Sequence, residues 1–217
     1  MDQPLLGPAR HGHRVRDGPP RPRPRPHGRV RHAVTGRSWL MGPELRRRGI
    51  TRLARDGWGA GRSVWDGDVG ERELVVEQLV VREEHAPAHV ARVLGLEAGA
   101  DVLARGRRFV LDGKPVLLAS SYFPADLVAG SAITRDDTGP GGSYARLAEL
   151  GHGPVRFREE IRSRMPTQDE AARLGLGSGT PVVLICRTAF GADGRTVEVN
   201  EMTLDSAAYV LEYDFEA

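Results

Sequence analysis

The sequence predicts an α+β fold, an antiparallel sheet with flanking helices that is built from two similar helix–hairpin halves. The first observation is the Asp-Gly pair at 112–113 between two apolar, β-prone runs, a strong hairpin signal because Gly tolerates positive φ. The second is a repeat: the Leu-Gly-Leu at 94–96 returns at 174–176, and the Asp-Gly pair returns at 193–194. One such unit cannot bury its own apolar face, so we expect the two to pack into one sheet.

The chain divides by composition into residues 1–40 and residues 41–217. The first 40 residues hold seven of the 15 prolines and nine arginines against two acidic residues, without any helical apolar period. We therefore expect 1–40 to be disordered and 41–217 to form the folded domain. The arginine-rich segment could be a basic arm for nucleic acid, but a linker, or a displaced or out-of-frame start, is the favoured interpretation.

The remaining composition is that of an ordinary globular protein. Residues 41–217 carry 22 basic and 27 acidic side chains, so the basic character belongs to the first 40 residues. No apolar run approaches 18 residues and no signal peptide is recognisable, which predicts a cytoplasmic protein without a membrane partner. The single cysteine, Cys186, excludes an internal disulfide and is expected to be a buried structural thiol. No metal or nucleotide motif is present, so no cofactor is expected.

The elements before the central hairpin are unevenly marked. Residues 44–53 have a charge pattern too broken to assign, and residues 58–65 look like a turn into a strand. Residues 74–81 are typical of a partly exposed strand. Pro87 suits the first turn of a helix that continues to Leu94.

The elements after the hairpin are marked more clearly. Residues 136–142 form a Gly-rich loop, and Ser143 is expected to cap a helix over 144–150 that Gly151 ends. Residues 155–165 alternate imperfectly and predict a strand. Thr167 with a glutamate three residues later forms a capping box that opens the next helix. The strands of the second copy follow, and residues 202–215 close the chain.

Arginines mark a candidate site on the first strand of the hairpin. Side chains alternate along a strand, so Arg105, Arg107 and Phe109 share one face. Two arginines on one face can form a fork for a carboxylate or phosphate, although a solvated strand face would explain them as well. The repeat matches Arg107 with Arg187, and this favours a pocket near the junction of the two halves.

From about residue 48 to its end, the chain resembles the UTRA effector-binding domain of HutC-type, GntR-family transcriptional regulators. The resemblance implies a fold like that of chorismate lyase, a pocket for a small and often anionic effector, a homodimer and no catalytic residues. It is carried by the Leu-Gly-Leu at 94–96, Arg107 with 112–115, the Ser-Ser-Tyr-Phe-Pro-Ala-Asp at 120–126, and the residues at 160–161, 181–182 and 193–198.

The same resemblance implies a set of ligand-binding positions. Arginine and hydroxyl groups suit an anion, and carboxylates suit hydroxyl groups or an amine. Structural interpretations stand beside these: a bond across strands for Ser121, a core position for the two tyrosines, and a pair with a neighbouring arginine for the glutamate at 160. The positions are Ser63, Arg107, Ser121, Tyr122, Glu160, Glu198 and Tyr209.

Three functions remain open from the sequence. The first is a ligand-responsive transcriptional regulator, or its isolated effector-sensing domain. The family places a winged helix-turn-helix upstream, and residues 1–47 are too few and too proline-rich for one, so operator DNA is a partner only where such a head is present. The second is an enzyme of chorismate lyase-like fold with Glu198 as general acid. The third is sequence-independent nucleic-acid binding through residues 10–37.

Overall fold

The computed structural model describes residues 45–70 and 72–216. Every described residue belongs to the compact unit Leu40–Ala217. The disordered segment expected over 1–40 lies outside the described residues and stays a prediction. Within the described part, no helix is both long and apolar enough to span a membrane.

Strands and short helices alternate along the described chain. The strands are β1 (Leu45–Arg48), β2 (Leu74–His85), β3 (Asp101–Leu111), β4 (Lys114–Pro124), β5 (Arg156–Arg164), β6 (Val182–Phe190), β7 (Thr196–Asp205) and β8 (Tyr209–Glu212). The α-helices are α1 (Arg55–Trp58), α2 (Asp66–Val69), α3 (Ala88–Leu94), α4 (Ala125–Val128), α5 (Gly142–Glu149) and α6 (Gln168–Leu174), and two 3₁₀ turns are η1 (Thr51–Leu53) and η2 (Ala132–Thr134).

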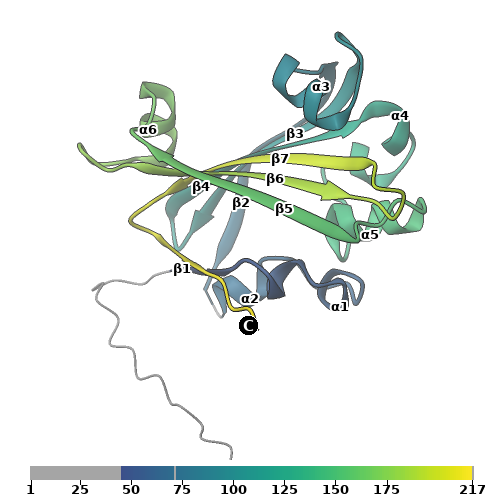
Figure 1. Cartoon of the computed structure of the whole chain (residues 1–217). Helices are drawn as coiled ribbons and strands as arrows, with labels where there is room; N and C mark the ends of the chain where they lie inside the picture. The colour runs from purple at the N-terminus through teal and green to yellow at the C-terminus, as the bar shows by residue number, and fades with distance from the viewer. Residues whose placement is uncertain (1–44, 71, 217) are drawn as a thin grey trace, which may run out of the picture. The chain divides into compact units, whose positions relative to one another are not determined.

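Six of the strands form one antiparallel sheet in the order β2-β3-β4-β7-β6-β5 (Figure 1). The predicted α+β, antiparallel architecture is confirmed. The pair β4–β7 forms the centre, so that β2-β3-β4 and β5-β6-β7 are two halves joined edge to edge.

The predicted repeat is visible in the two halves. In each half a helix, α3 or α6, precedes a hairpin, β3–β4 or β6–β7. Gly95 and Gly175 end the two helices in the left-handed region, at φ of 69° and 62°. The hairpin turn at Asp112 and Gly113 also has positive φ at both residues, which is why the Asp-Gly pair marks it.

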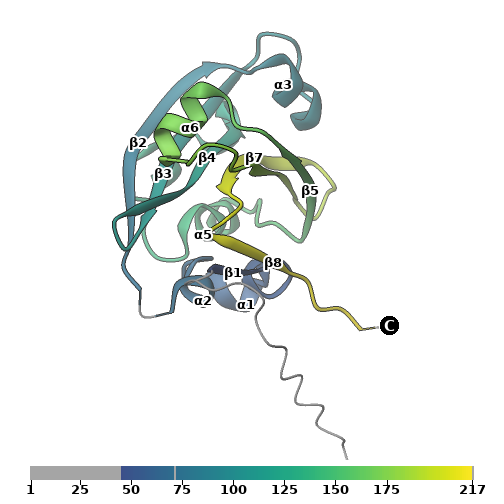
Figure 2. The same cartoon turned by 90° about the vertical axis from the view of Figure 1, so that its left-hand side faces the viewer.

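The two faces of the sheet are covered differently (Figures 1 and 2). Helices α3 and α6 lie on one face, and β1, β8, α1 and α2 lie on the other. Strands β1 and β8 pair in parallel in a two-stranded sheet of their own. The apolar core on their side is centred on Leu45, Phe109 and Tyr209, and a neighbouring core surrounds Trp58, Phe123 and Tyr144.

Two expectations for the N-terminal part are corrected by the structure. Residues 45–48, left unassigned, form β1, because they pair with β8 near the other end of the chain. Residues 58–65 do not lead into a strand; they run from α1 through a turn to α2. The reason is tertiary: the Trp65 ring packs on Phe109 at a centroid distance of 4.5 Å, and this contact fixes the local path.

The predicted capping box at Thr167 is present, with its side chain accepting from the Glu170 amide and Glu170 bonding back. Ser143, in contrast, does not cap the helix that follows the Gly-rich loop. That helix begins at Gly142, two residues before the expected start at 144, and its cap is Gly141 at φ 78°. A Cβ at Gly141 would lie 2.4 Å from the Trp58 carbonyl oxygen, so only glycine allows this close approach.

Candidate functional site

A cavity of about 550 Å³ lies against the sheet face that carries α1 and α2. The sheet supplies its floor through β3, β6 and β7, and the Gly-rich loop 136–143 forms one wall. The lining combines cations, aromatic rings and hydrogen-bonding groups: Arg52, Ser63, Trp65, Arg105, Arg107, Phe109, Tyr144, Arg187, Glu198 and Asn200 are among its residues.

One row of side chains crosses five strands on this face. The strand registers place Arg105 opposite Ser121, Ser121 opposite Asn200, Asn200 opposite Arg187, and Arg187 opposite Glu159. Directly opposite residues point to the same side of a sheet. The row, which we call the polar row, therefore joins both halves of the molecule under the cavity.

Arg107 enters the cavity beside the polar row. Its Nη2 donates to Ser121 Oγ at 2.5 Å, and its Nε is buried without a hydrogen-bond partner. Burial is the main effect on this guanidinium, followed by the opposing field of Glu198, and it lowers the pKa of Arg107 to about 10. At neutral pH the side chain is therefore a half-buried cation with free donor capacity.

Arg187 reaches the same cavity from the other half. It is 5% exposed, its Nε is buried without a partner, and no hydrogen bond or ion pair of the described residues engages its guanidinium. The guanidinium stacks over the Tyr144 ring at 5.4 Å. Burial alone lowers the pKa of Arg187, but Tyr144, Glu198 and Glu159 outweigh it and raise the pKa.

The cavity also holds one buried carboxylate. Glu198 is 2% exposed, and its Oε2 accepts a hydrogen bond from the Tyr144 hydroxyl at 2.7 Å. Burial, with a contribution from Glu198, raises the pKa of Tyr144 well above its usual value. Tyr144 thus stays a neutral donor, and the carboxylate and the unpartnered Asn200 Oδ1 can accept from a ligand's hydroxyl or amine.

Arg105, although it lines the cavity, serves the loop. Its Nη1 donates to the carbonyl oxygens of Ile133, at 2.6 Å, and Arg135, and its Nη2 donates to that of Asp136 at 2.9 Å. A guanidinium that satisfies three carbonyl groups fixes the start of the Gly-rich loop over the cavity. Arg105 and Arg107 therefore do not form the suggested fork together: Arg105 holds the loop, and Arg107 remains in the cavity.

The predicted ligand-binding positions are only partly brought together. Ser63, Arg107 and Glu198 line the cavity. Ser121 does not line it, but its hydroxyl accepts a hydrogen bond from Arg107. Tyr122, Glu160 and Tyr209 do not line it.

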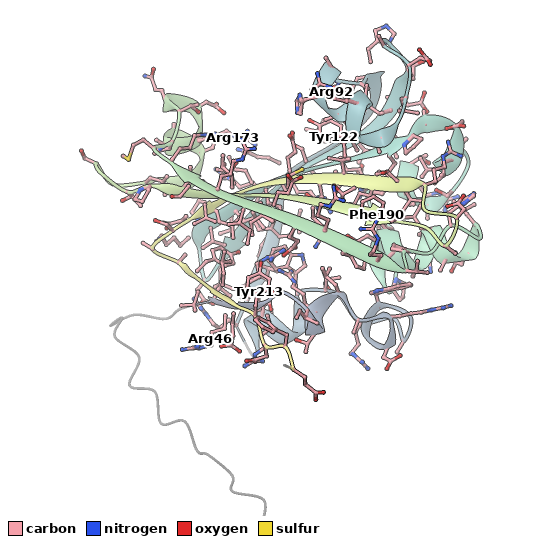
Figure 3. All side chains as sticks on the ribbon, viewed as in Figure 1. Arg46, Arg92, Tyr122, Arg173, Phe190 and Tyr213 are labelled. Carbon is pink, nitrogen blue, oxygen red and sulfur yellow. The ribbon has the colours of Figure 1, made fainter. Side chains whose placement is uncertain are left out.

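Each of the three outlying residues has a structural reason for its place. Tyr122 lies on the α3 side of the sheet (Figure 3), since it alternates with Ser121, and it packs against the core beneath α3. Glu160 is exposed on that face for the same reason, whereas its neighbour Glu159 faces the cavity side. Tyr209, the first residue of β8, is buried in the core, where burial raises the pKa of its hydroxyl.

Several lining residues were not among the predicted positions. Arg187 carried a signal, since it is the repeat mate of Arg107. The loop 136–142 was recognised as a loop, and its glycines permit the close backbone approach that binding loops need. Arg52, Tyr144 and Asn200 carried no such signal. Arg52 reaches the cavity from η1 with its Nη1 3.2 Å from Asp68 Oδ2, and burial is the main cause that lowers its pKa to about 10.

A second cavity of about 610 Å³ lies between the η1 region and the start of β5. Its lining is mainly apolar and includes Ile50, Leu53, Phe157 and Tyr213. Glu159 lines this second cavity, and on the sheet it is directly opposite Arg187, which lines the first. Within the described residues, no three His, Cys, Asp or Glu side chains are grouped as a metal site would require.

The cavity on this sheet is lined by arginines, aromatic rings and hydrogen-bond acceptors, a lining that suits a small polar molecule. Residues 71–209 match the UTRA domain, and the chain belongs to this family. The expected resemblance is thereby confirmed, and in the GntR family of regulators the UTRA domain is the effector-binding domain.

The relatives are transcriptional regulators by name. An uncharacterized HTH-type transcriptional regulator of Streptomyces coelicolor is 35% identical over 133 residues, which are 60% of this chain and 49% of the relative. The HTH-type transcriptional repressor PhnF of Mycolicibacterium smegmatis is 32% identical over 109 residues, 50% and 44% of the two chains. The chain thus spans about half the length of these curated relatives.

Solved structures agree with the fold. The effector domain of PhnF from Mycobacterium smegmatis superposes with a TM-score of 0.58 at 25% identity, over 66% of this chain and 89% of that one. The C-terminal domain of the histidine utilization repressor from Pseudomonas syringae has a TM-score of 0.59 at 19% identity, over 67% and 100%. The second likeness concerns the fold alone.

Proposed function

We propose that this chain is the sensor of a GntR-type regulator, of the HutC subfamily, and that it binds a small anionic metabolite between Arg107 and Arg187. Binding modulates the affinity of the regulator for operator DNA, provided that a winged-helix head accompanies the sensor. The proposal includes a homodimer that acts in the cytoplasm and has no catalytic activity of its own. The membership in the UTRA family and the names of the relatives support it.

The observation that carries the ligand class is the state of Arg187. A guanidinium that is 5% exposed and engages no acceptor of the described residues leaves strong donors without partners. Buried donors of this kind are costly unless a ligand satisfies them. A carboxylate or phosphate bound between the two arginines would do so with charge-assisted hydrogen bonds.

The rest of the cavity narrows the ligand further. Glu198 and Asn200 offer acceptors. A ligand with a hydroxyl or amine beside its anionic group can therefore bind these acceptors and the arginine donors together. Trp65 and Phe109 supply an apolar side. Phosphorylated sugars, hydroxy acids and amino acids share these properties.

A thermal-shift screen of the full chain against these three classes, followed by calorimetry, tests the proposal. We expect a hit that stabilises the wild type and is lost in Arg187→Met. The matched control is Arg92→Met, which removes an exposed arginine on α3. Hits that are indifferent to Arg187 would contradict the site, and release of pyruvate from chorismate would contradict a sensor without catalytic activity.

A further inference from the structure

Glu159 and Arg187 are opposite each other on β5 and β6, but they do not pair. Side chains in this relation have Cβ atoms about 4.5–5.5 Å apart, within reach of an ion pair. The Glu159 carboxylate instead accepts a two-pronged contact from Arg47 of β1, with Nη1 donating to Oε2 at 2.8 Å and Nη2 to Oε1. The Tyr213 hydroxyl, at 3.1 Å, completes its shell.

One buried carboxylate thus stands in the field of two buried arginines. The side chains of Arg47 and Glu159 are 1% and 9% exposed. Burial by itself raises the pKa of Glu159, but the hydrogen bonds of Arg47 and the charges of Arg47 and Arg187 lower it, so the group is ionised at neutral pH. Arg47 engages both oxygen atoms of this carboxylate, and a turn of Glu159 toward Arg187 would give up this two-pronged geometry.

We propose that Glu159 is an internal competitor for the effector's anionic group. Held by Arg47, it leaves Arg187 free for the effector; turned toward Arg187, it takes the effector's place. This inference rests on the proposed function, since it assumes that an anion binds at Arg187. It adds a determinant that lies outside the lining of the effector cavity.

The competition couples the cavity to β1. Strand β1 pairs with β8 in a sheet of their own, and the fork from Arg47 ties it to β5 of the main sheet. An anion bound to Arg187 occupies the alternative partner of Glu159. It therefore favours the state in which Arg47 holds Glu159 and so ties β1 to β5. Because coupling between two sites is reciprocal, loss of the contact between Arg47 and Glu159 must lower the affinity for the anion by the same factor.

The test uses inorganic phosphate as the probe at constant ionic strength, with the full chain and titration calorimetry. Arg47→Met frees Glu159 and is expected to lower the affinity for phosphate about tenfold, within the usual range of coupling between sites. Arg47→Met combined with Glu159→Gln removes the competitor too, and should restore wild-type affinity. Glu159→Gln alone should bind phosphate at least as tightly as the wild type.

The controls are Arg46→Met, which alters an exposed arginine on the same strand, and Glu160→Gln, which alters the neighbouring carboxylate on the opposite face. Neither should change the affinity. If Arg47→Met binds phosphate like the wild type, or if the double variant stays as weak as Arg47→Met, the competition is refuted and Arg47 is only structural. Wild-type binding that is absent, or unaffected by Arg187→Met, contradicts the proposed function itself.

Discussion

Arg107 and Arg187 occupy equivalent strands in the two halves of the sheet, and both line one cavity. Arg107 comes from β3 in one half and Arg187 from β6 in the other, and β4–β7 lies between them. An anion held by both arginines would therefore bridge the two copies of the repeat.

Replacement of Arg107 by Ala should weaken binding of the effector by about 1.5–3 kcal/mol, the usual contribution of a hydrogen bond to a charged group. Folding stability should change little, because Arg107 donates a hydrogen bond to Ser121 and its Nε has no partner. Calorimetry with a hit from the ligand screen, together with denaturant unfolding, measures both effects. Arg108→Ala, on the opposite face of β3, is the control and should leave affinity unchanged. Unfolding of Arg107→Ala without any effect on binding would make Arg107 structural.

Effector affinity should fall at alkaline pH. The charged form of Arg107 binds the anion, and its pKa is lowered to about 10, mainly by burial. Affinity should thus be constant from pH 7 to 9 and decrease above pH 10 as the guanidinium loses its proton. Arg107→Met removes this group, so its weaker binding should lack the decrease near pH 10. An identical alkaline decrease in both proteins would assign it to another group.

The loop over the cavity should depend on Arg105. Arg105→Met leaves the carbonyl oxygens of Ile133, Arg135 and Asp136 without their donor, which should cost about 2–3 kcal/mol of unfolding free energy. Hydrogen exchange of residues 133–141 should accelerate and the effector should bind more weakly. Arg135→Met changes an exposed side chain of the same loop and keeps its carbonyl, so it should match the wild type. Slow exchange in Arg105→Met would mean that the loop is held by other contacts.

Acid should destabilise the domain in part through Glu170. Hydrogen bonding to Arg164 is the largest cause that lowers the pKa of Glu170 to about 2, and the capping box adds to it. Because the folded pKa lies below the unfolded value near 4.5, this stabilisation is present above pH 4.5 and is lost as pH falls toward 2. Melting temperatures of Glu170→Gln should decline less over that range than those of the wild type. Glu97→Gln, an exposed carboxylate, should follow the wild type; equal declines in all three proteins would exclude Glu170.

Local signals explain what could be predicted from the sequence. The Asp-Gly turn, the glycines that end α3 and α6, and the capping box at Thr167 each act within a few residues. The repeat places the Asp-Gly pair and the helix-ending glycine in both halves, whereas the capping box belongs to α6 alone. The same periodicity of two put Arg105 and Arg107 on one face. It could not show that Arg105 would be used by the carbonyl oxygens of a loop about 30 residues later.

Distant pairing explains what was missed. Strand β1 forms against β8, more than 160 residues away, and its own sequence reads only as a run of arginines. Glu160, expected at the ligand site from the family resemblance, lies on the face opposite to that of its neighbour Glu159, and the imperfect alternation of residues 155–165 did not show which face each would take. A shift of one residue changes the face on which a side chain lies.

The polar row makes the cavity sensitive to the length of each strand. Its five side chains come from five strands, one from each, and every one depends on the register of its neighbours. Deleting or inserting a single residue within β3, β4, β5, β6 or β7 would turn the local contribution to the opposite face, even if the sheet still formed. Changes of chain length in this domain should therefore be tolerated in the turns between strands but not within these five strands.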